Sequence, residues 1–296
     1  MQEHKTLSTS TSSTEPRGSK EFNVMTAPEI PVILTNESTR LEYLIKHFWD
    51  HSSIGDTLFL HHREETEQAW ANYIGGLSRL PKDIAINSIK ELFSRPDWHE
   101  KVYQLFTDLA EKYFYNPNSP YRNEELYIPV LESMISSLSD ESLKSTPQYR
   151  LQTVLRNRIG NKAIDFKYTL LSGKEKTLYS LQAEYTLLFI NNPGCDACSN
   201  SIRFINNSEP IQRFLKSNRI TILSFYPDED QELWRRHYSE YPKNWTVGYD
   251  KDLIVLRNNL YDLKAIPSFY LLDKGKTVLL KDATLQEIER YLNTLL

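Results

Sequence analysis

Two cysteines three positions apart are the residues of this sequence best suited to do chemistry. Cys195 and Cys198 are the only cysteines in 296 residues, and they lie in the segment "NNPGCDACSN" at 191–200. A thiolate is a strong nucleophile, and a second thiol within reach can close a disulfide and release a trapped partner. The spacing therefore predicts thiol–disulfide exchange, with Cys195 as the attacking sulfur and Cys198 as the resolving sulfur.

Two other interpretations of the pair are weaker. Free cysteines commonly serve as small core residues, but chance is a poor explanation for two of them at this spacing. Tetrahedral zinc needs four ligands, whereas the pair supplies two and His237 is the only histidine after His99. The adjacent His61 and His62 would point in opposite directions in a strand or loop, which is typical of surface histidines. We therefore expect no metal site and no cofactor.

The pair lies where a predicted strand passes into a predicted helix. The run "TLLFINN" at 186–192 indicates a buried strand, and helical spacing follows from Asp196 to about Lys216, broken near Pro210. The first turn of a helix has unpaired N–H groups and the positive end of the helix dipole, and both stabilise a thiolate. This strand–CxxC–helix context strengthens the redox interpretation.

The elements around the pair predict an α/β domain from residue 158 to 296. Short β-rich runs alternate with helical ones there, which is typical of a central mixed sheet flanked by helices. Turn signals at Ser172–Gly173 and Lys274–Gly275 indicate two hairpins. The expected strands and the closing helix are 166–171, 176–178, 186–192, 220–226, 268–273, 277–281 and the helix at 284–296.

Residues 29–157 predict a separate, all-helical domain. Apolar residues recur at helical spacing, after the capping stretch Asn36–Thr39, behind Pro81 and behind Pro129, which we expect at a helix start. Residues 1–28 form a polar, Ser/Thr-rich tail that we expect to be disordered.

Net charge and hydropathy argue against some classes of binding partner and against a membrane-spanning helix. A net charge of −4 provides no basic field for nucleic acid or anionic lipid. No apolar run approaches the ~20 residues that a membrane-spanning helix needs. The N-terminal residues also lack the apolar centre of a signal peptide. An export signal or a lipid anchor at a missing N-terminus stays open, and so does a cytoplasmic location.

From about residue 158 to 296 the sequence resembles the thioredoxin-like superfamily, and within it the TlpA-like thiol-disulfide oxidoreductases. The matching segments are "GNKAIDF", "TLLFINNPGCDACSN" and "AIPSFYLLDKGKTVLL". The resemblance implies a cis bond between Ile266 and Pro267, placed against the CxxC. Pro267 would then shape the peptide site, and the backbone of Ile266 would meet the substrate. It also implies protein substrates that carry thiols or disulfides, a redox partner that keeps the CxxC reduced, and a periplasmic or cell-envelope location.

Three positions depart from the pattern of the superfamily. The tryptophan that commonly precedes the first cysteine is replaced by "PG", the buried acid of well-known thioredoxins falls at Phe189, and a glutamate of some TlpA-like reductases falls at Ser201. Either another group deprotonates the resolving thiol, or the exchange is slower. A peroxiredoxin is disfavoured, because Asn192 stands where that family needs threonine or serine.

The dipeptide between the cysteines bears on the direction of electron flow. Asp196 places a negative charge beside the nucleophile, where a like charge disfavours the thiolate, and neither intervening residue is basic. This pattern predicts a reductase or an isomerase in preference to a primary oxidant. One alternative stays open: a non-enzymatic protein- or peptide-binding module with a thioredoxin fold and a structural disulfide.

The helical half resembles, less specifically, an uncharacterised domain found ahead of thioredoxin-like domains in exported proteins of Gram-negative anaerobes. It carries no residues to which we assign chemistry. The resemblance implies that it docks a partner or shields one side of the redox domain.

Overall fold

The structure is a computed structural model that describes residues 28–52, 54–137 and 140–296. It divides into two compact units, one of residues up to 84 together with 95–106, and one of residues 85–94 and 107–296. The predicted disordered tail lies outside the described residues except for Pro28. The predicted domain boundary at residue 158 stays a prediction.

The described residues before 158 are helical, as the apolar spacing predicted, and contain no strand. Asn36 caps the first helix, since its side-chain oxygen accepts hydrogen bonds from the backbone N–H groups of Ser38 and Thr39. The helices are α1 Glu37–Lys46, α2 Leu58–His61, α3 Arg63–Leu77, α4 Lys82–Phe93, α5 Glu100–Ala110, the π-helical turn η1 Glu111–Tyr115, α6 Glu124–Ser137 and α7 Glu141–Val154.

The prediction that Pro129 starts a helix was wrong. Helix α6 begins at Glu124, and Pro129 lies inside it. Proline has no backbone N–H, so the carbonyl of Glu125 loses its usual helical donor at this point. The residues from Leu126 to Leu131 are all buried, and packing of this apolar stretch offsets the local cost.

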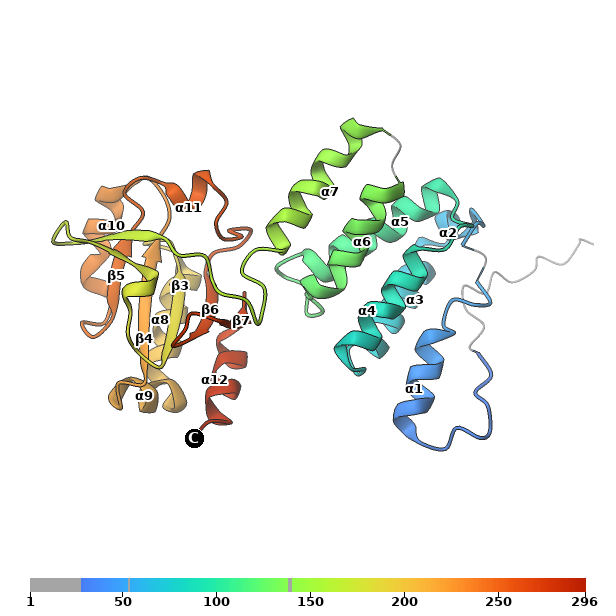
Figure 1. Ribbon diagram of the computed structural model, residues 1–296, viewed down its shortest axis with the longest axis horizontal. Coiled ribbons are helices and arrows are strands. Elements are labelled where there is room, and N and C mark those ends of the chain that lie inside the picture. Colours follow the sequence, from blue (N-terminus) through green and yellow to red (C-terminus); the bar gives the residue numbers. More distant parts are fainter. Residues whose placement is uncertain (1–27, 53, 138–139) are drawn as a thin grey trace, which may run out of the picture. The chain divides into compact units, whose positions relative to one another are not determined.

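The C-terminal part contains the expected mixed sheet, with seven strands in the order β2-β1-β5-β4-β3-β6-β7 (Figure 1). Strands β3, β4 and β5 are parallel, while β6 runs antiparallel to β3 and β1 runs antiparallel to β5. The strands are β1 Lys167–Leu170, β2 Glu175–Thr177, β3 Tyr185–Ile190, β4 Ile220–Tyr226, β5 Thr246–Tyr249, β6 Ser268–Asp273 and β7 Val278–Lys281.

Strand β5 was missed by the sequence analysis. It is four residues long and contains Gly248, so its local pattern is weak. The glycine has a packing role, because a Cβ at this position would lie 2.5 Å from Cδ2 of Tyr168. The ring of Tyr168 therefore occupies the space where another residue would carry its side chain.

Helices and turns cover both faces of the sheet. Leu187 and Phe189 of β3 belong to one buried cluster, and Leu188 and Ile190 belong to another, as alternation along a strand requires. The predicted break near Pro210 is confirmed by two separate helices, α8 and α9. The elements are η2 Leu178–Ser180, α8 Asp196–Asn207, α9 Glu209–Lys216, α10 Gln231–His237, η3 Tyr238–Glu240, α11 Ile254–Arg257 and α12 Leu285–Asn293. Within the described ranges, no helix is both long and apolar enough to span a bilayer.

Candidate functional site

The predicted site residues gather at one end of the sheet. Ile190, the last residue of β3, pairs with Ser268, the first residue of β6, in antiparallel register. The turn that follows β3 and the residue that precedes β6 therefore lie at the same end. That turn leads to the cysteines, and Pro267 is the residue before β6. The Ile266–Pro267 peptide bond is cis.

The two cysteines occupy different environments at the start of α8. Cys195 is the N-cap residue, and its sulfur accepts a hydrogen bond from the backbone N–H of Cys198 at 3.3 Å. Both thiols are free; Cys195 is partly exposed, whereas Cys198 is buried. The first sulfur can meet a substrate at the surface, and the second lies one helical turn further in.

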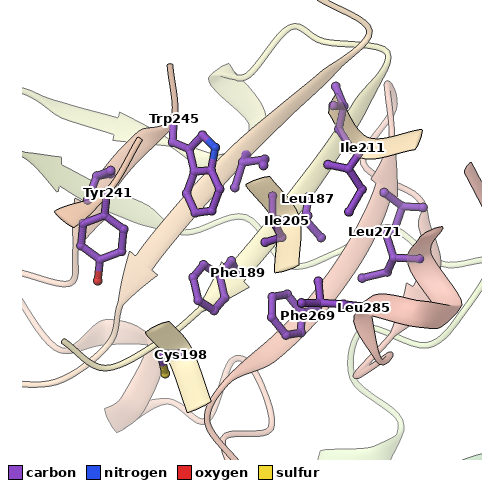
Figure 2. Close-up of a cluster of buried hydrophobic side chains, with 14 of the residues drawn as sticks. Leu187, Phe189, Cys198, Ile205, Ile211, Tyr241, Trp245, Phe269, Leu271 and Leu285 are labelled. Carbon is purple, nitrogen blue, oxygen red and sulfur yellow. The ribbon is translucent and has the colours of Figure 1, made fainter. Parts of the chain in front are cut away.

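Burial determines the protonation state of the inner thiol. Desolvation and a hydrogen bond with the Cys195 sulfur raise the pKa of Cys198 to about 12, and a backbone hydrogen bond from Asn192 opposes the shift in part. Figure 2 shows Cys198 at the edge of the buried cluster that contains Phe189 and Phe269. At neutral pH, Cys198 is therefore a thiol that must lose its proton before it can attack.

Phe189 and Ser201 stand at the two positions where some thioredoxin-like proteins carry an acid. Neither residue supplies a proton acceptor for Cys198. Phe189 stacks on Phe269, with 4.9 Å between the ring centroids. Ser201 is buried, and its hydroxyl donates a hydrogen bond to the carbonyl of Ala197 at 2.8 Å. Both departures noted in the sequence therefore remain departures in the structure.

A buried network of uncharged polar groups lies beside the thiols, and the sequence analysis did not find it. The Tyr241 hydroxyl donates to the side-chain oxygen of Asn191 at 2.6 Å, and the Asn191 amide donates to the Ser224 hydroxyl at 2.8 Å. Burial is the main cause that raises the pKa of Tyr241, and negative charge on Cys198 and Cys195 raises it further. Tyr241 and Cys198 belong to the same buried cluster, and the Tyr241 hydroxyl points toward the Cys198 end of it in Figure 2.

His237 lies against the turn that leads to Cys195. Arg235 and Arg236, which precede it on α10, are exposed. The histidine is instead only 30% exposed. A Cβ on Gly194 would lie 3.7 Å from both Cε1 and Nε2 of its ring. Gly194 has a φ of +71°, a conformation that other residues adopt with strain.

The loop before β6 is held by a buried cluster of charges, which we call the charge cluster: Glu124, Asp262, Lys264, Lys281 and Asp282. The Lys264 ammonium lies 2.5 Å from Glu124, 2.8 Å from Asp262 and 3.5 Å from Asp282. Lys281 reaches the other oxygen of Glu124 at 2.7 Å. Burial lowers the pKa of Lys264, but the three carboxylates outweigh it and raise the pKa overall. Lys264 therefore stays charged inside the protein.

Possible metal ligands do not converge in the part of the chain that the structure describes. No three His, Cys, Asp or Glu side chains there are arranged to hold a metal ion. His61 is exposed, and Nδ1 of His62, the residue before α3, lies 3.7 Å from a carboxylate oxygen of Glu65.

Comparison with known proteins agrees with this fold. Residues 1–157 match the family model described as Domain of unknown function (DUF5106). A thioredoxin-like protein from Bacteroides caccae is 48% identical, with 92% of this chain and 99% of that chain covered and a TM-score of 0.89. The chain belongs to the DUF5106 family. The C-terminal part of this DUF5106 protein has the thioredoxin-like fold, as the resemblance implied.

Two further relatives match the C-terminal half of the DUF5106 protein. The C-terminal domain of an uncharacterized protein from Bacteroides fragilis is 55% identical, covering 46% of this chain and 98% of that chain, with a TM-score of 0.46. The thiol-disulfide oxidoreductase ResA of Bacillus cereus is 25% identical over 138 residues, which are 46% of this chain and 77% of ResA. The similarity to ResA supports an oxidoreductase class for this DUF5106 protein.

Proposed function

We propose that this protein carries out thiol–disulfide exchange on protein substrates through Cys195 and Cys198. The observation that carries the proposal is the asymmetry of the pair. Cys195 is partly exposed at the N-cap of α8, whereas Cys198 is buried, and its backbone nitrogen lies 3.3 Å from the Cys195 sulfur. A nucleophile needs access to the substrate, while a resolving thiol needs access only to the first sulfur.

The reaction has two displacement steps. The Cys195 thiolate attacks one sulfur of a substrate disulfide, forms a mixed disulfide and expels the other substrate sulfur as a thiolate, which takes up a proton. Cys198 then loses its proton and attacks the Cys195 sulfur, which releases the second substrate thiol. The substrate gains two electrons and two protons, and the CxxC is oxidised to a disulfide. A dithiol partner protein must reduce the CxxC again by the same exchange in reverse.

The residues before β6 form the second half of the proposed substrate site. Ile266 packs, partly buried, against the same cluster as both cysteines. We assign Pro267 to shaping the peptide site and the backbone of Ile266 to contacting an extended substrate. Their place at the same end of the sheet as the cysteines supports this assignment.

The proposed direction is that of a reductase or an isomerase. Asp196 is exposed in the first turn of α8, beside the attacking sulfur, and Ala197 adds no positive charge. The family resemblance favours work in the periplasm or cell envelope, with a partner that keeps the CxxC reduced. We also propose that residues 29–157 form a helical domain that docks a partner or shields the domain formed by 158–296.

Single-cysteine variants test the proposed roles. Cys198→Ser should accumulate mixed disulfides with a disulfide substrate such as insulin, because nothing then resolves the Cys195 adduct. Cys195→Ser should form none, and both variants should lose turnover. Preferential adduct formation at Cys198 would overturn the assignment. If mild reductant leaves the wild-type disulfide intact and no exchange is detected, the alternative of a binding module with a structural disulfide holds instead.

A further inference from the structure

His237 and Glu240 form a hydrogen-bonded dyad beside the turn that carries Cys195. The Nδ1 atom of His237 lies 2.7 Å from a carboxylate oxygen of Glu240, one turn further along the chain. A carboxylate on Nδ1 fixes the ring orientation and leaves Nε2 as the atom that can exchange a proton. This arrangement is common in sites where histidine acts as an acid or a base.

The free edge of the imidazole faces the cysteine turn. Cε1 and Nε2 are the two ring atoms that lie 3.7 Å from the Cβ position of Gly194, the residue directly before Cys195. Burial is the main cause of the raised pKa of Tyr241, and charges on Cys198, Glu240 and Cys195 raise it further.

We propose that His237, oriented by Glu240, is the proton-transfer partner of Cys195. The neutral imidazole takes the proton of the Cys195 thiol at Nε2, which yields a thiolate and an imidazolium. The thiolate then attacks the substrate disulfide, and the imidazolium returns its proton to the expelled substrate thiolate. This role rests on the proposed exchange function, and it concerns the attacking thiol Cys195.

The other ionisable groups around the dyad do not take this role. Tyr241 already donates its hydroxyl proton to Asn191, and its raised pKa keeps it protonated at neutral pH. Asp196, exposed at the start of α8, adds negative charge that favours the imidazolium but disfavours the thiolate. Arg235 and Arg236 precede His237 on α10 with exposed side chains.

The pH dependence of Cys195 alkylation tests the proposal on the reduced, full-length protein. Iodoacetamide labelling at Cys195, followed by mass spectrometry, should show an inflection between about pH 5 and 8, where histidine changes charge. His237→Asn keeps a donor for Glu240 but removes the Nε2 atom. It should abolish this inflection and slow labelling at pH 6.5 by about tenfold, since a nearby opposite charge shifts ionisation by a unit or more.

His47 provides a matched control. Its Nδ1 lies 2.5 Å from Asp50 with the same three-residue spacing, and its side chain is 32% exposed, against 30% for His237. His47→Asn should therefore leave the labelling profile unchanged.

An unchanged labelling profile in His237→Asn would overturn the proposal, and so would an equal change in His47→Asn. A fold defect is recognised separately by circular dichroism. The labelling readout needs no substrate, so it is independent of the exchange assay. If the wild type shows the inflection but exchanges no disulfides, the proposed function fails while the coupling of His237 to Cys195 stands.

Discussion

The cysteine turn and the charge cluster are built in opposite ways. In the charge cluster, the two lysines and three carboxylates are largely buried and paired, with contacts of 2.5 to 3.5 Å. Beneath the cysteine turn, the buried polar groups of Asn191 and Tyr241 are uncharged. The dyad of His237 and Glu240 near this turn is partly exposed.

The difference follows from what each region must do. A buried ion pair is stable only when both partners stay charged and in place, so a cluster of such pairs holds a loop rigidly. The loop that ends in Ile266 and Pro267 needs this rigidity if its backbone is to receive a peptide. A sulfur that gains and loses a proton during each cycle needs neighbours that tolerate both states, and neutral hydrogen-bonding groups do so at lower cost.

The largest effect is expected from breaking the charge cluster. Lys264→Met leaves three carboxylates buried with one cation fewer, which should lower the free energy of unfolding by about 3–5 kcal/mol. Lys144→Met is the control, since Lys144 pairs with the exposed Glu141 at 2.6 Å. It should lower the free energy of unfolding by less than about 1 kcal/mol. Urea unfolding of both variants measures the difference. Equal costs would show that the cluster does not hold the loop.

A smaller loss of unfolding free energy is expected from breaking the uncharged network of Tyr241, Asn191 and Ser224. Tyr241→Phe removes the donor to Asn191 and leaves a buried amide oxygen unpaired, at a cost of about 1–3 kcal/mol. Urea unfolding under the same conditions compares it with Lys264→Met. A loss as large as that of Lys264→Met would contradict the distinction between the two regions.

The raised pKa of the buried Cys198 thiol should make the free energy of unfolding depend on pH. The pKa of Cys198 is about 12 in the folded protein against an ordinary 9.0, so the unfolded chain releases this proton first as pH rises. The folded state then binds more protons than the unfolded state, and stability falls above pH 9. Between pH 8 and 10, the free energy of unfolding of the reduced wild type should fall by about 1 kcal/mol relative to that of Cys198→Ala. The tyrosines titrate alike in both proteins, so they do not contribute to this difference. If the difference in free energy of unfolding between the two proteins stays constant over this pH range, Cys198 ionises with its ordinary pKa.

The smallest effect is expected from the exposed acid beside Cys195. Asp196→Asn removes a negative charge near the thiolate, which stabilises the reduced form and should raise the reduction potential by about 10 mV, equivalent to ~0.5 kcal/mol. Equilibration with glutathione buffers measures the shift. The wild-type potential should lie nearer the ~−270 mV of thioredoxin than the ~−120 mV of the strongest oxidants. A wild-type value near the oxidising limit would contradict the proposed direction.

Local signals were sufficient to predict most of the elements. The cap at Asn36, the break at Pro210 and the passage from strand to helix at Cys195 each depend on residues within a few positions of one another. The CxxC chemistry was predicted for the same reason, because both thiols lie in one turn of one helix. Pro129 and β5 were the failures, since burial in the tertiary structure overrode a local preference in α6 and stabilised a strand with a weak pattern around Gly248.

The surroundings of the thiols were decided by the tertiary structure alone. Tyr241 and Asn191 are 50 residues apart in the chain, and they meet because the parallel strands β3 and β4 carry the segments that follow them to the same end of the sheet. His237 reaches Gly194 by the same route. The sequence by itself determined which atoms can exchange electrons, because that depends on the residue types and their spacing within one turn. The groups that handle the protons come from segments distant in the sequence, and the packing of the sheet brings them together.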